Sequence, residues 1–410
     1  MTKDKPGEIS DIKGGITAPL GFLAGSIHCG VKEGNAAKED IALIISGSAA
    51  VAAGTFTTNK VKAAPVLISA AHLRAAGARA IIANSGNANA CTGAHGLDSA
   101  RRMCRAAAKA LGLEEREVLV CSTGRIGVRL PTAKMEAAIA SFPAKLGSHA
   151  RHSRSAARAI MTSDTFPKEV AVECEIGGKT VRIGGIAKGA GMIDPNMATM
   201  LSLLTTDAVI GKADLQRALR ASVEESFNRI TVDGDMSTND TVLALANGQA
   251  GNSPLVWGGR EFAVFQGALD RVTAALARMI VKDGEGVSRF IDLQLTGART
   301  QREARLAARA IANSMLVKCA WYGGDPNWGR IMDAVGYSGA RIREERIRIA
   351  YDGAPAVEGG LCAATPVARL RAVARKREFT ITVDLGMGSG SHRIWTTDLT
   401  TKYVEFNMGE

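Results

Sequence analysis

Short apolar runs recur along the chain, and their length and composition predict buried strands. A run of four to six residues rich in Val, Ile and Leu is typical of a strand that is covered on both faces. Such runs occupy residues 41–45, 80–83, 118–121, 201–204 and 241–246. Residues 170–176 and 180–183 flank Gly177-Gly178. A two-residue Gly-Gly connection favours the primed turns of a β-hairpin, so we expect a hairpin there.

Segments with apolar residues at helical spacing lie between several of these runs. Residues 98–113 predict a helix in which Asp98 is the N-cap and Met103, Ala107 and Leu111 share one face. The same spacing predicts helices over residues 132–146, 214–228, 265–280 and 300–314. Alternating strands and helices, with an antiparallel hairpin among them, favour a layered fold over a purely parallel sheet.

The pattern changes near residues 282–286, a Lys-Asp-Gly-Glu-Gly segment. Beyond it we expect one helix and strands at residues 346–351, 379–384 and 403–407, where polar and apolar residues alternate. We therefore predict an α/β fold, an α+β layered sandwich over residues 1–285, with a smaller C-terminal α+β domain over residues 286–410.

Composition and charge exclude several classes of protein. The chain has 410 residues, of which 46% are hydrophobic and 22% charged, an ordinary balance for a globular protein. The formal net charge is +11, but aromatic residues make up only 4% and no zinc-finger or RNP-like motif is present. We therefore interpret the basic runs as solvated helix faces, and we expect no nucleic-acid partner.

Cysteine and histidine spacing points away from disulfides and metals. Seven scattered cysteines form no CxxC pair, which indicates a reducing compartment, and six histidines form no HExxH motif, so we predict no metal. Residues 1–15 alternate basic and acidic residues, and the longest apolar run, residues 41–56, is interrupted by Gly and Ser. We expect neither a targeting segment nor a membrane span, and the cytoplasm as location.

One segment, residues 188–207, has the pattern of an unusual reaction site. Glycines and an Asp194-Pro-Asn turn lead into an apolar run that begins with Thr199. The Thr199 hydroxyl could attack the carbonyl of Ala198, and hydrolysis of the resulting ester would free a Thr amine. Such an amine has a pKa of about 7.7–8.0 and can act as the base for its own hydroxyl. From the pattern alone, an ordinary β-branched residue in a strand is the commoner interpretation.

Motifs along most of the chain resemble those of the ornithine acetyltransferases, the bifunctional glutamate N-acetyltransferase family. Each motif alone is weak, but together and in this order they are specific. The segment around Thr199 resembles the family's self-processing site. The other motifs are residues 83–90 (ANSGNANA), 122–124 (STG), 161–168 (MTSDTFPK), 231–240 (TVDGDMSTND), 282–286 (KDGEG), 324–330 (GDPNWGR) and 397–399 (TDL).

The resemblance implies a role for particular residues. Thr199 is expected to be the nucleophile, released by cleavage between Ala198 and Thr199 into chains of residues 1–198 and 199–410. Thr123 and Gly124 match the family's oxyanion hole, one hydroxyl and one backbone N–H. Without the resemblance, this Ser-Thr-Gly would be an ordinary strand-to-loop turn. The family fold implies a likeness to the N-terminal-nucleophile hydrolases.

The same resemblance implies the residues that bind substrate. They are Thr165, Lys188, Thr199, Glu285 and Asn407. The Lys188 ammonium would meet a substrate carboxylate, and Glu285 would hold an amino group or relay a proton. The family's final hydroxyl residue has no counterpart after Asn407, where only Met-Gly-Glu follows.

A cluster of acidic residues and an amide at 233, 235, 239 and 240 faintly resembles an EF-hand loop. Thr238 and Ala244 stand where that loop needs Gly and Glu, so we do not expect calcium. We interpret the cluster as a hydrogen-bonded turn that supports the site.

The activity implied is a ping-pong transfer of acetyl from N-acetylornithine to glutamate in arginine biosynthesis, without a cofactor. The assembly implied is two copies of each fragment, α2β2. Three alternatives stay open. The enzyme could also take acetyl from acetyl-CoA as a co-substrate. It could be a related self-processed amidase or aminopeptidase, or a binding protein that has kept the fold.

Overall fold

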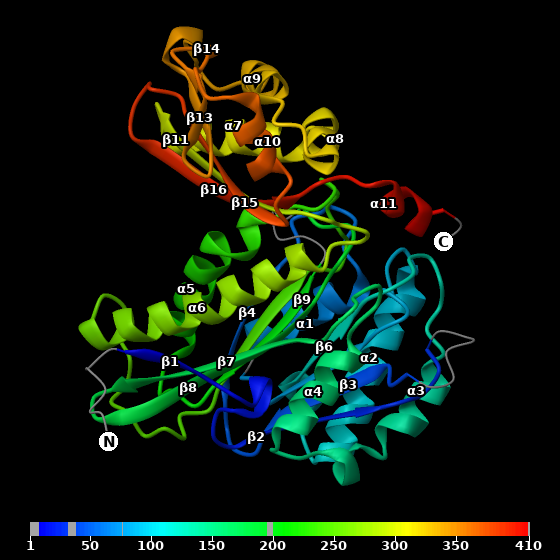
Figure 1. The fold of residues 1–410 in the computed structure, drawn as a ribbon. Helices are drawn as coiled ribbons and strands as arrows, with labels where there is room; N and C mark the ends of the chain where they lie inside the picture. Colours follow the sequence, from blue (N-terminus) through cyan, green and yellow to red (C-terminus); the bar gives the residue numbers. More distant parts are fainter. Residues whose placement is uncertain (1–7, 32–37, 76, 195–199, 409–410) are drawn as a thin grey trace. The chain divides into compact units, whose positions relative to one another are not determined.

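The computed structural model describes residues 8–31, 38–75, 77–194 and 200–408 (Figure 1). The chain forms two compact units, and each is described by itself. Unit 1 comprises residues 1–189, 195–228 and 236–280, and unit 2 comprises residues 190–194, 229–235 and 281–410. The boundary predicted at residue 286 and the division predicted after Ala198 stay predictions.

The first sheet of unit 1 brings several short strands together in the order β1-β7-β8-β9-β10-β4. β8 and β9 are antiparallel with Lys188 opposite Leu201, and β9 and β10 are parallel with Leu201 opposite Thr241. The ends of three central strands therefore meet at one edge of the sheet. The strands are β1 (Ile9–Ile12), β4 (Val51–Phe56), β7 (Lys168–Ile176), β8 (Lys179–Lys188), β9 (Leu201–Thr206) and β10 (Thr241–Ala246).

The second sheet of unit 1 has the order β2-β3-β5-β6. Its strands are β2 (Phe22–Ile27), β3 (Ile41–Ser46), β5 (Ala80–Asn84) and β6 (Val118–Ser122). The two sheets pack face to face, because buried Ile44 and Ile81 of this sheet share one core with Leu203 and Leu243 of the first. The predicted layered α/β fold is confirmed.

Helices cover the outer faces of both sheets (Figure 1). α2 (Gly93–Leu111) packs on the second sheet through residues such as Met103 and Ala107, and α3 (Thr132–Ile139) packs beside it. α5 (Lys212–Glu225) and α6 (Arg260–Lys282) lie on the first sheet.

Two further helices, α1 and α4, pack against strands of unit 1. On α1 (Ala64–Ala75), the Ser69 hydroxyl donates to the carbonyl of Val120 at 2.7 Å and accepts from its N–H at 2.8 Å, which satisfies the edge of β6. α4 (Ala150–Ala159) packs against β2 and β3. Short 3₁₀ turns lie at η1 (Gly15–Thr17), η2 (Glu115–Glu117), η3 (Phe142–Lys145), η4 (Phe227–Arg229) and, in unit 2, η5 (Glu344–Arg346).

Unit 2 is a mixed sheet in the order β14-β13-β12-β15-β11-β16, in which β11 and β15 run parallel. Apolar and polar residues alternate along its strands, as expected for a sheet with one covered face. The strands are β11 (Phe290–Ala298), β12 (Arg348–Tyr351), β13 (Ala354–Glu358), β14 (Leu361–Cys362), β15 (Glu378–Asp384) and β16 (Gly390–Thr397).

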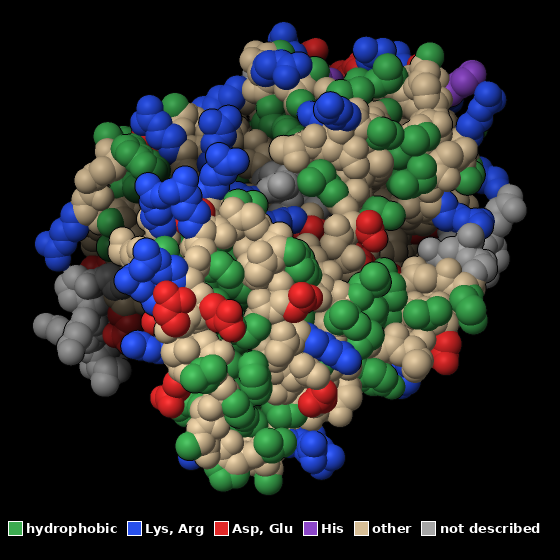
Figure 2. Space-filling model, turned by 90° about the horizontal axis from the view of Figure 1, so that it is seen from above, with side chains coloured by type: hydrophobic (Ala, Val, Ile, Leu, Met, Phe, Trp, Pro, Cys, Tyr) green, Lys and Arg blue, Asp and Glu red, His purple; other side chains and the backbone are tan. Residues whose placement is uncertain are grey.

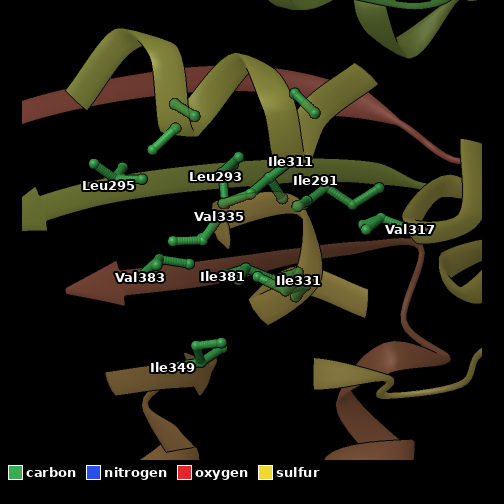
Figure 3. Packing of buried hydrophobic residues seen from close by; sticks show 14 of the residues in the cluster. Ile291, Leu293, Leu295, Ile311, Val317, Ile331, Val335, Ile349, Ile381 and Val383 are labelled. Carbon is green, nitrogen blue, oxygen red and sulfur yellow. The ribbon is translucent and has the colours of Figure 1, made fainter. Parts of the chain in front are cut away.

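The covered face of this sheet forms the core of unit 2. Leu293 and Ile381 point from the sheet toward Ile311 and Val335 of the helices (Figure 3). Several helices begin at a side-chain cap, such as Thr300, whose hydroxyl accepts from the Glu303 N–H at 3.1 Å. The helices are α7 (Gln301–Asn313), α8 (Met315–Gly323), α9 (Trp328–Gly336), α10 (Val367–Ala374) and α11 (Thr401–Phe406).

The apolar runs and the hairpin lie where the sequence places them. The five runs form β3, β5, β6, β9 and β10, and the hairpin forms β7 and β8. Gly177 and Gly178 both have positive φ, 58° and 73°, which is the backbone that a primed turn requires. These predictions are confirmed.

Two helix boundaries were wrong. α2 begins at Gly93 after Thr92, so Asp98 lies inside the helix and is not its N-cap. Two glycines in the first turn conceal this start, because glycine disfavours a helix interior. The helix predicted over residues 132–146 ends at Ile139, and a separate 3₁₀ turn contains Pro143, which cannot donate a backbone hydrogen bond.

The C-terminal region was also predicted incorrectly in two respects. More than the one expected helix follows residue 286, since α7 to α11 all lie there. The strand predicted over residues 403–407 belongs to helix α11. The Thr400 side chain accepts a hydrogen bond from the Tyr403 N–H at 3.3 Å, and this cap starts a helix despite the β-favouring Tyr, Val and Phe.

Charged side chains of both signs lie on the surface (Figure 2). On the face shown in Figure 2, Lys and Arg side chains lie interspersed with acidic and hydrophobic ones. Within the residues that the structure describes, no helix is both long and apolar enough to cross a membrane.

The core of unit 2 gives a direct test of its packing. Leu293 is fully buried, whereas Leu361 on the edge strand β14 is 73% exposed. We expect Leu293→Ala to lower the free energy of unfolding by about 2–5 kcal/mol, because it removes buried methyl groups and leaves a cavity. Leu361→Ala, the matched control, should change it by less than about 0.5 kcal/mol. Guanidinium denaturation measures both, and equal effects would contradict this description of the core.

Candidate active site

The turn that follows β6 carries two of the predicted site residues, Thr123 and Gly124. Gly124 has φ 130°, and a Cβ atom there would lie 2.3 Å from the carbonyl carbon of Gly86 and 2.4 Å from the Asn87 nitrogen. Only glycine fits this backbone and this close approach. The sequence motif Ser-Thr-Gly therefore forms a tightly held turn.

The Asn-rich segment from Asn84 to Asn89 supports that turn with side-chain amides. The Ser122 hydroxyl donates to Asn84 Oδ1 at 2.7 Å, and Asn84 Nδ2 donates to the carbonyl of Asn87 at 2.9 Å. The Thr123 N–H donates to the carbonyl of Asn84 at 3.0 Å. Amide side chains satisfy buried backbone groups here, so the residues around Thr123 have a defined geometry.

Lys188, the last residue of β8, meets this turn. Its side chain is buried, with a relative exposure of 4%, and Nζ lies 3.2 Å from Thr123 Oγ1. An ammonium group has only donors, so Lys188 donates and Thr123 accepts. The hydroxyl proton of Thr123 is then left to donate elsewhere. The structure thus brings two predicted site residues together.

A buried carboxylate, Asp164, partly offsets the positive charges of Lys188 and Lys168. Lys168 Nζ donates to Asp164 Oδ1 at 2.7 Å, and the Gly189 N–H donates to the same oxygen at 2.7 Å. Burial alone would raise the pKa of Asp164, but the Lys188 and Lys168 ammonium groups and the Gly189 N–H more than offset it and lower the pKa to about 2. The carboxylate therefore stays ionised at neutral pH.

Thr165 directly follows Asp164 in the same segment and is exposed. Asp164 itself accepts hydrogen bonds from Lys168 and from the N–H of Gly189, the residue after Lys188. The predicted substrate residue Thr165 therefore lies at the surface, next to the buried Asp164.

Unit 2 holds the other predicted substrate residues, Glu285 and Asn407. Asn407 Nδ2 donates to Glu285 Oε2 at 3.1 Å, and the Glu285 N–H donates to the carbonyl of Ala190 at 3.0 Å. A Cβ atom on Gly191 would lie 2.3 Å from the Glu285 carboxyl carbon. Glycine at 191 therefore makes room for the carboxylate.

The predicted cleavage residues Ala198 and Thr199 lie outside the described residues. The described chain resumes at Met200, directly before β9. Across the ladder, Lys188 stands opposite Leu201, two positions after Thr199 in the sequence.

The sequence analysis missed two charged residues of this site, Asp164 and Lys168. Both stand in the motif of residues 161–168, four positions apart, and an opposite pair at that spacing was the available signal. Among the described residues, no three His, Cys, Asp or Glu side chains gather into a group that could hold a metal ion. The prediction that the protein needs no metal stays a prediction.

The arrangement in unit 1 suits a reaction in which negative charge develops on a carbonyl oxygen. A hydroxyl and a glycine backbone lie side by side after β6, and a buried ammonium lies next to the hydroxyl. Donors held in place before the reaction stabilise an oxyanion without reorganisation. Acyl transfer is a reaction of this kind.

Comparison with known proteins gives a consistent result. The sequence model of the ArgJ family matches residues 23–409. The arginine biosynthesis bifunctional protein ArgJ of Geobacter sulfurreducens is 48% identical over 388 residues, which cover 94% of this chain and 98% of that protein. The glutamate N-acetyltransferase of Methanocaldococcus jannaschii is 46% identical over 410 residues, covering 97% of this chain and 98% of that protein.

A solved structure is also similar. The arginine biosynthesis bifunctional protein ArgJ of Bacillus halodurans aligns with a TM-score of 0.50 and 42% sequence identity. The match covers 52% of this chain and 100% of the solved chain.

The buried charge group makes stability depend on pH. The folded-state pKa of Asp164, about 2, lies below its ordinary value of 3.8, so Asp164 stabilises the fold above about pH 4. This contribution is lost as the pH falls from about 4 toward 2. At about pH 7, Asp164→Asn should lower the free energy of unfolding by on the order of 2 kcal/mol or more.

Urea denaturation at several pH values measures this difference. The gap between wild type and Asp164→Asn should shrink below about pH 4, and a gap that does not change with pH would contradict this account. Asp11→Asn is the control, because Asp11 pairs with Arg271 at the surface, where such pairs contribute at most about 1 kcal/mol.

Proposed function

This chain belongs to the ArgJ family, and from that premise we propose that it is a glutamate N-acetyltransferase of arginine biosynthesis. It transfers acetyl from N2-acetyl-L-ornithine to L-glutamate through an acetyl-Thr199 intermediate. Thr199 becomes available when the chain cleaves itself between Ala198 and Thr199. The observation that carries the proposal is the buried contact of Lys188 with Thr123, beside the Gly124 turn.

Self-cleavage begins when the Thr199 hydroxyl adds to the carbonyl carbon of Ala198. The Thr199 nitrogen leaves with a proton, so the peptide bond becomes an ester. Water then hydrolyses the ester and yields residues 1–198 and a second chain that starts at Thr199. The new amine has a pKa of about 7.7–8.0, so a useful fraction is neutral near pH 7 and can take the proton of the hydroxyl.

Acetyl transfer uses the same hydroxyl twice. Thr199 Oγ attacks the acetyl carbonyl of N-acetylornithine, the oxygen becomes an oxyanion, and ornithine leaves as an amine after protonation. The glutamate amine then attacks the acetyl ester, and Thr199 Oγ leaves with its proton restored. Splitting the exchange into two steps avoids a direct encounter of two substrates.

The Thr123 hydroxyl and the Gly124 N–H are the proposed oxyanion donors. Support comes from Lys188, which donates to Thr123 Oγ1 at 3.2 Å, so that the hydroxyl proton can point to the oxyanion. The positive charge of Lys188 also favours negative charge on a neighbouring oxygen. Loss of one such donor costs on the order of 10²–10³ in rate in other enzymes.

Substrate recognition is assigned to Thr165, Lys188, Thr199, Glu285 and Asn407. In unit 1, a carboxylate suits the ammonium of Lys188. In unit 2, an amino group suits the Glu285 carboxylate, whose Oε2 accepts from Asn407 Nδ2 at 3.1 Å. Ornithine and glutamate both carry the α-carboxylate that such a cation would recognise.

The reaction as proposed needs no cofactor. Acetyl-CoA as a second donor of acetyl is the second candidate function. The Geobacter relative is named a bifunctional protein, which favours it. In that case acetyl-CoA is a co-substrate that acetylates the same Thr199. Formation of N-acetylglutamate from acetyl-CoA and glutamate alone distinguishes the two. The assembly we propose is α2β2, from residues 1–198 and 199–410, in the cytoplasm.

Self-cleavage is tested by the mass of the purified protein under denaturing conditions. Wild type should give two fragments, with Thr199 at the new N-terminus of the second. Thr199→Ala removes the attacking hydroxyl and should give one uncut chain. Thr205→Ala, which changes a buried threonine of β9, is the control and should be cut like wild type. An uncut wild type would remove the free amine from the mechanism.

The two-step mechanism has a kinetic signature. Double-reciprocal plots with N-acetylornithine and glutamate as varied substrates should give parallel lines, because ornithine leaves before glutamate binds. Intersecting lines would exclude the ping-pong order. Release of acetate without any acceptor amine would instead indicate an amidase, and binding without turnover would indicate a binding protein.

A further inference from the structure

The strand register places one carboxyl group directly beside the residue that follows Thr199. β9 and β10 are parallel and begin in register at Leu201 and Thr241, so Met200 and Asp240 stand side by side just before them. Asp240 Oδ1 accepts a hydrogen bond from the Met200 N–H at 2.7 Å. The Thr241 N–H donates to the carbonyl of Met200 at 3.1 Å. Both the N–H and the carbonyl of Met200 therefore have a hydrogen-bond partner.

The Met200 nitrogen belongs to the peptide bond that joins Met200 to Thr199. Before cleavage this bond is one of two that tether Thr199 to the chain. After cleavage it is the only one, since Thr199 is then a chain terminus. Chain termini are poorly ordered unless something ties them down. The Asp240 carboxyl is suited to that task, because it accepts a hydrogen bond from this nitrogen.

Asp240 is an unusual residue for a position that needs only an acceptor. It is 1% exposed, and a buried carboxyl is costly compared with a smaller polar side chain. Burial raises its pKa well above the ordinary value, while the Met200 N–H and the charge of Lys188 act in the opposite direction. The raised pKa favours the neutral acid, for which asparagine is a close mimic.

The preceding residue, Asn239, donates a hydrogen bond to the turn of Ser122, Thr123 and Gly124, which we call the oxyanion turn. Asn239 Nδ2 donates to the carbonyl of Ser122 at 2.9 Å and to that of Ala88 at 2.6 Å. Ser122 directly precedes Thr123. Two adjacent side chains in the loop before β10 therefore hold the backbone next to Thr199 and the backbone next to the proposed oxyanion donors.

We propose that Asp240 is a positioning residue that aligns Thr199 with the oxyanion turn, with Asn239 as its counterpart on the turn. The inference rests on the proposed function, in which Thr199 is the cleaving and acetyl-carrying nucleophile. In this role Asp240 acts through the Met200 N–H. Because a misplacement of about 1 Å can cost on the order of 10²-fold in rate, loss of this hydrogen bond should slow self-cleavage.

The matched control is Asp207, at the other end of β9. It is fully buried, and its oxygens accept from the Arg182 N–H at 2.7 Å and from the Leu20 N–H at 2.9 Å. Asp207→Ala thus removes a buried carboxyl that directly follows β9 and holds backbone N–H groups of two other segments. Asp207 and Met200 stand at opposite ends of β9. It measures how much a general loss of stability slows cleavage.

The experiment is a time course of self-cleavage after cell-free synthesis of the full chain, read by intact mass. We expect Asp240→Ala to cleave about 10–10²-fold more slowly than wild type. Asp240→Asn keeps an oxygen acceptor in place and should cleave within about threefold of wild type. Asp207→Ala should cleave at the wild-type rate although it is less stable in urea.

Each outcome decides one question. Asp240→Ala cleaving as fast as Asp207→Ala overturns the inference, and so does Asp240→Asn cleaving as slowly as Asp240→Ala, which would require the acid itself. An uncut wild type contradicts the proposed function and the inference with it.

If Asp240→Ala does not fold, Asp240→Glu takes its place in the experiment. Glu shifts the carboxyl oxygen by one methylene, so slow cleavage by this variant supports the positioning role. Cleavage at the wild-type rate overturns the inference.

Discussion

A buried ammonium must be compensated, and in unit 1 this constraint determines how the candidate site is built. Lys188 is almost fully buried at the end of β8, where an uncompensated charge would be prohibitively costly. Asp164 supplies the opposite charge and is itself fixed by Lys168 and by the Gly189 N–H. With part of its charge offset in this way, Lys188 donates to Thr123 beside the Gly124 turn. Positive potential next to Thr123, the proposed oxyanion donor, is therefore built into the fold.

Around that charge group, the two parallel strand pairs of unit 1 bring the remaining groups to their positions. β5 and β6 end at Asn84 and Ser122, from which the supporting amides and the oxyanion turn extend. β9 and β10 begin at Leu201 and Thr241, so that the residues just before them are neighbours. In the proposed function, polar groups in the loops at strand ends carry the chemistry, while the strands themselves are buried and apolar.

Much of the fold follows from local pattern. The buried strands and the Gly-Gly hairpin of unit 1 could be predicted because apolar runs and turn glycines are local signals. Helix α11 could not, because its cap at Thr400 outweighs the strand preference of Tyr403 and its neighbours. The helices α8, α9 and α10 of unit 2 were not predicted, since each has only eight or nine residues and therefore few apolar positions at helical spacing.

The site residues show the same division. Thr123, Gly124 and Lys188 could be proposed only from whole motifs, since spacing alone does not distinguish them from turn residues. The contact of Lys188 with Thr123 joins residues 65 positions apart, and the Asp240 contact with Met200 joins residues 40 positions apart. Such pairs depend on the strand register, which cannot be read from a single sequence. The role of each residue in catalysis stays a prediction.

The central claim is that Thr199 carries the acetyl group, and the most direct measurement is to isolate that intermediate. The purified protein is mixed with N-acetylornithine in the absence of glutamate, quenched in acid, digested and analysed by peptide mass spectrometry. We expect one acetyl group as an ester on the hydroxyl of Thr199, in the peptide that begins with this residue, and its loss when glutamate is added before the quench. Acetyl on another residue, or none while N-acetylglutamate still forms, would contradict the account.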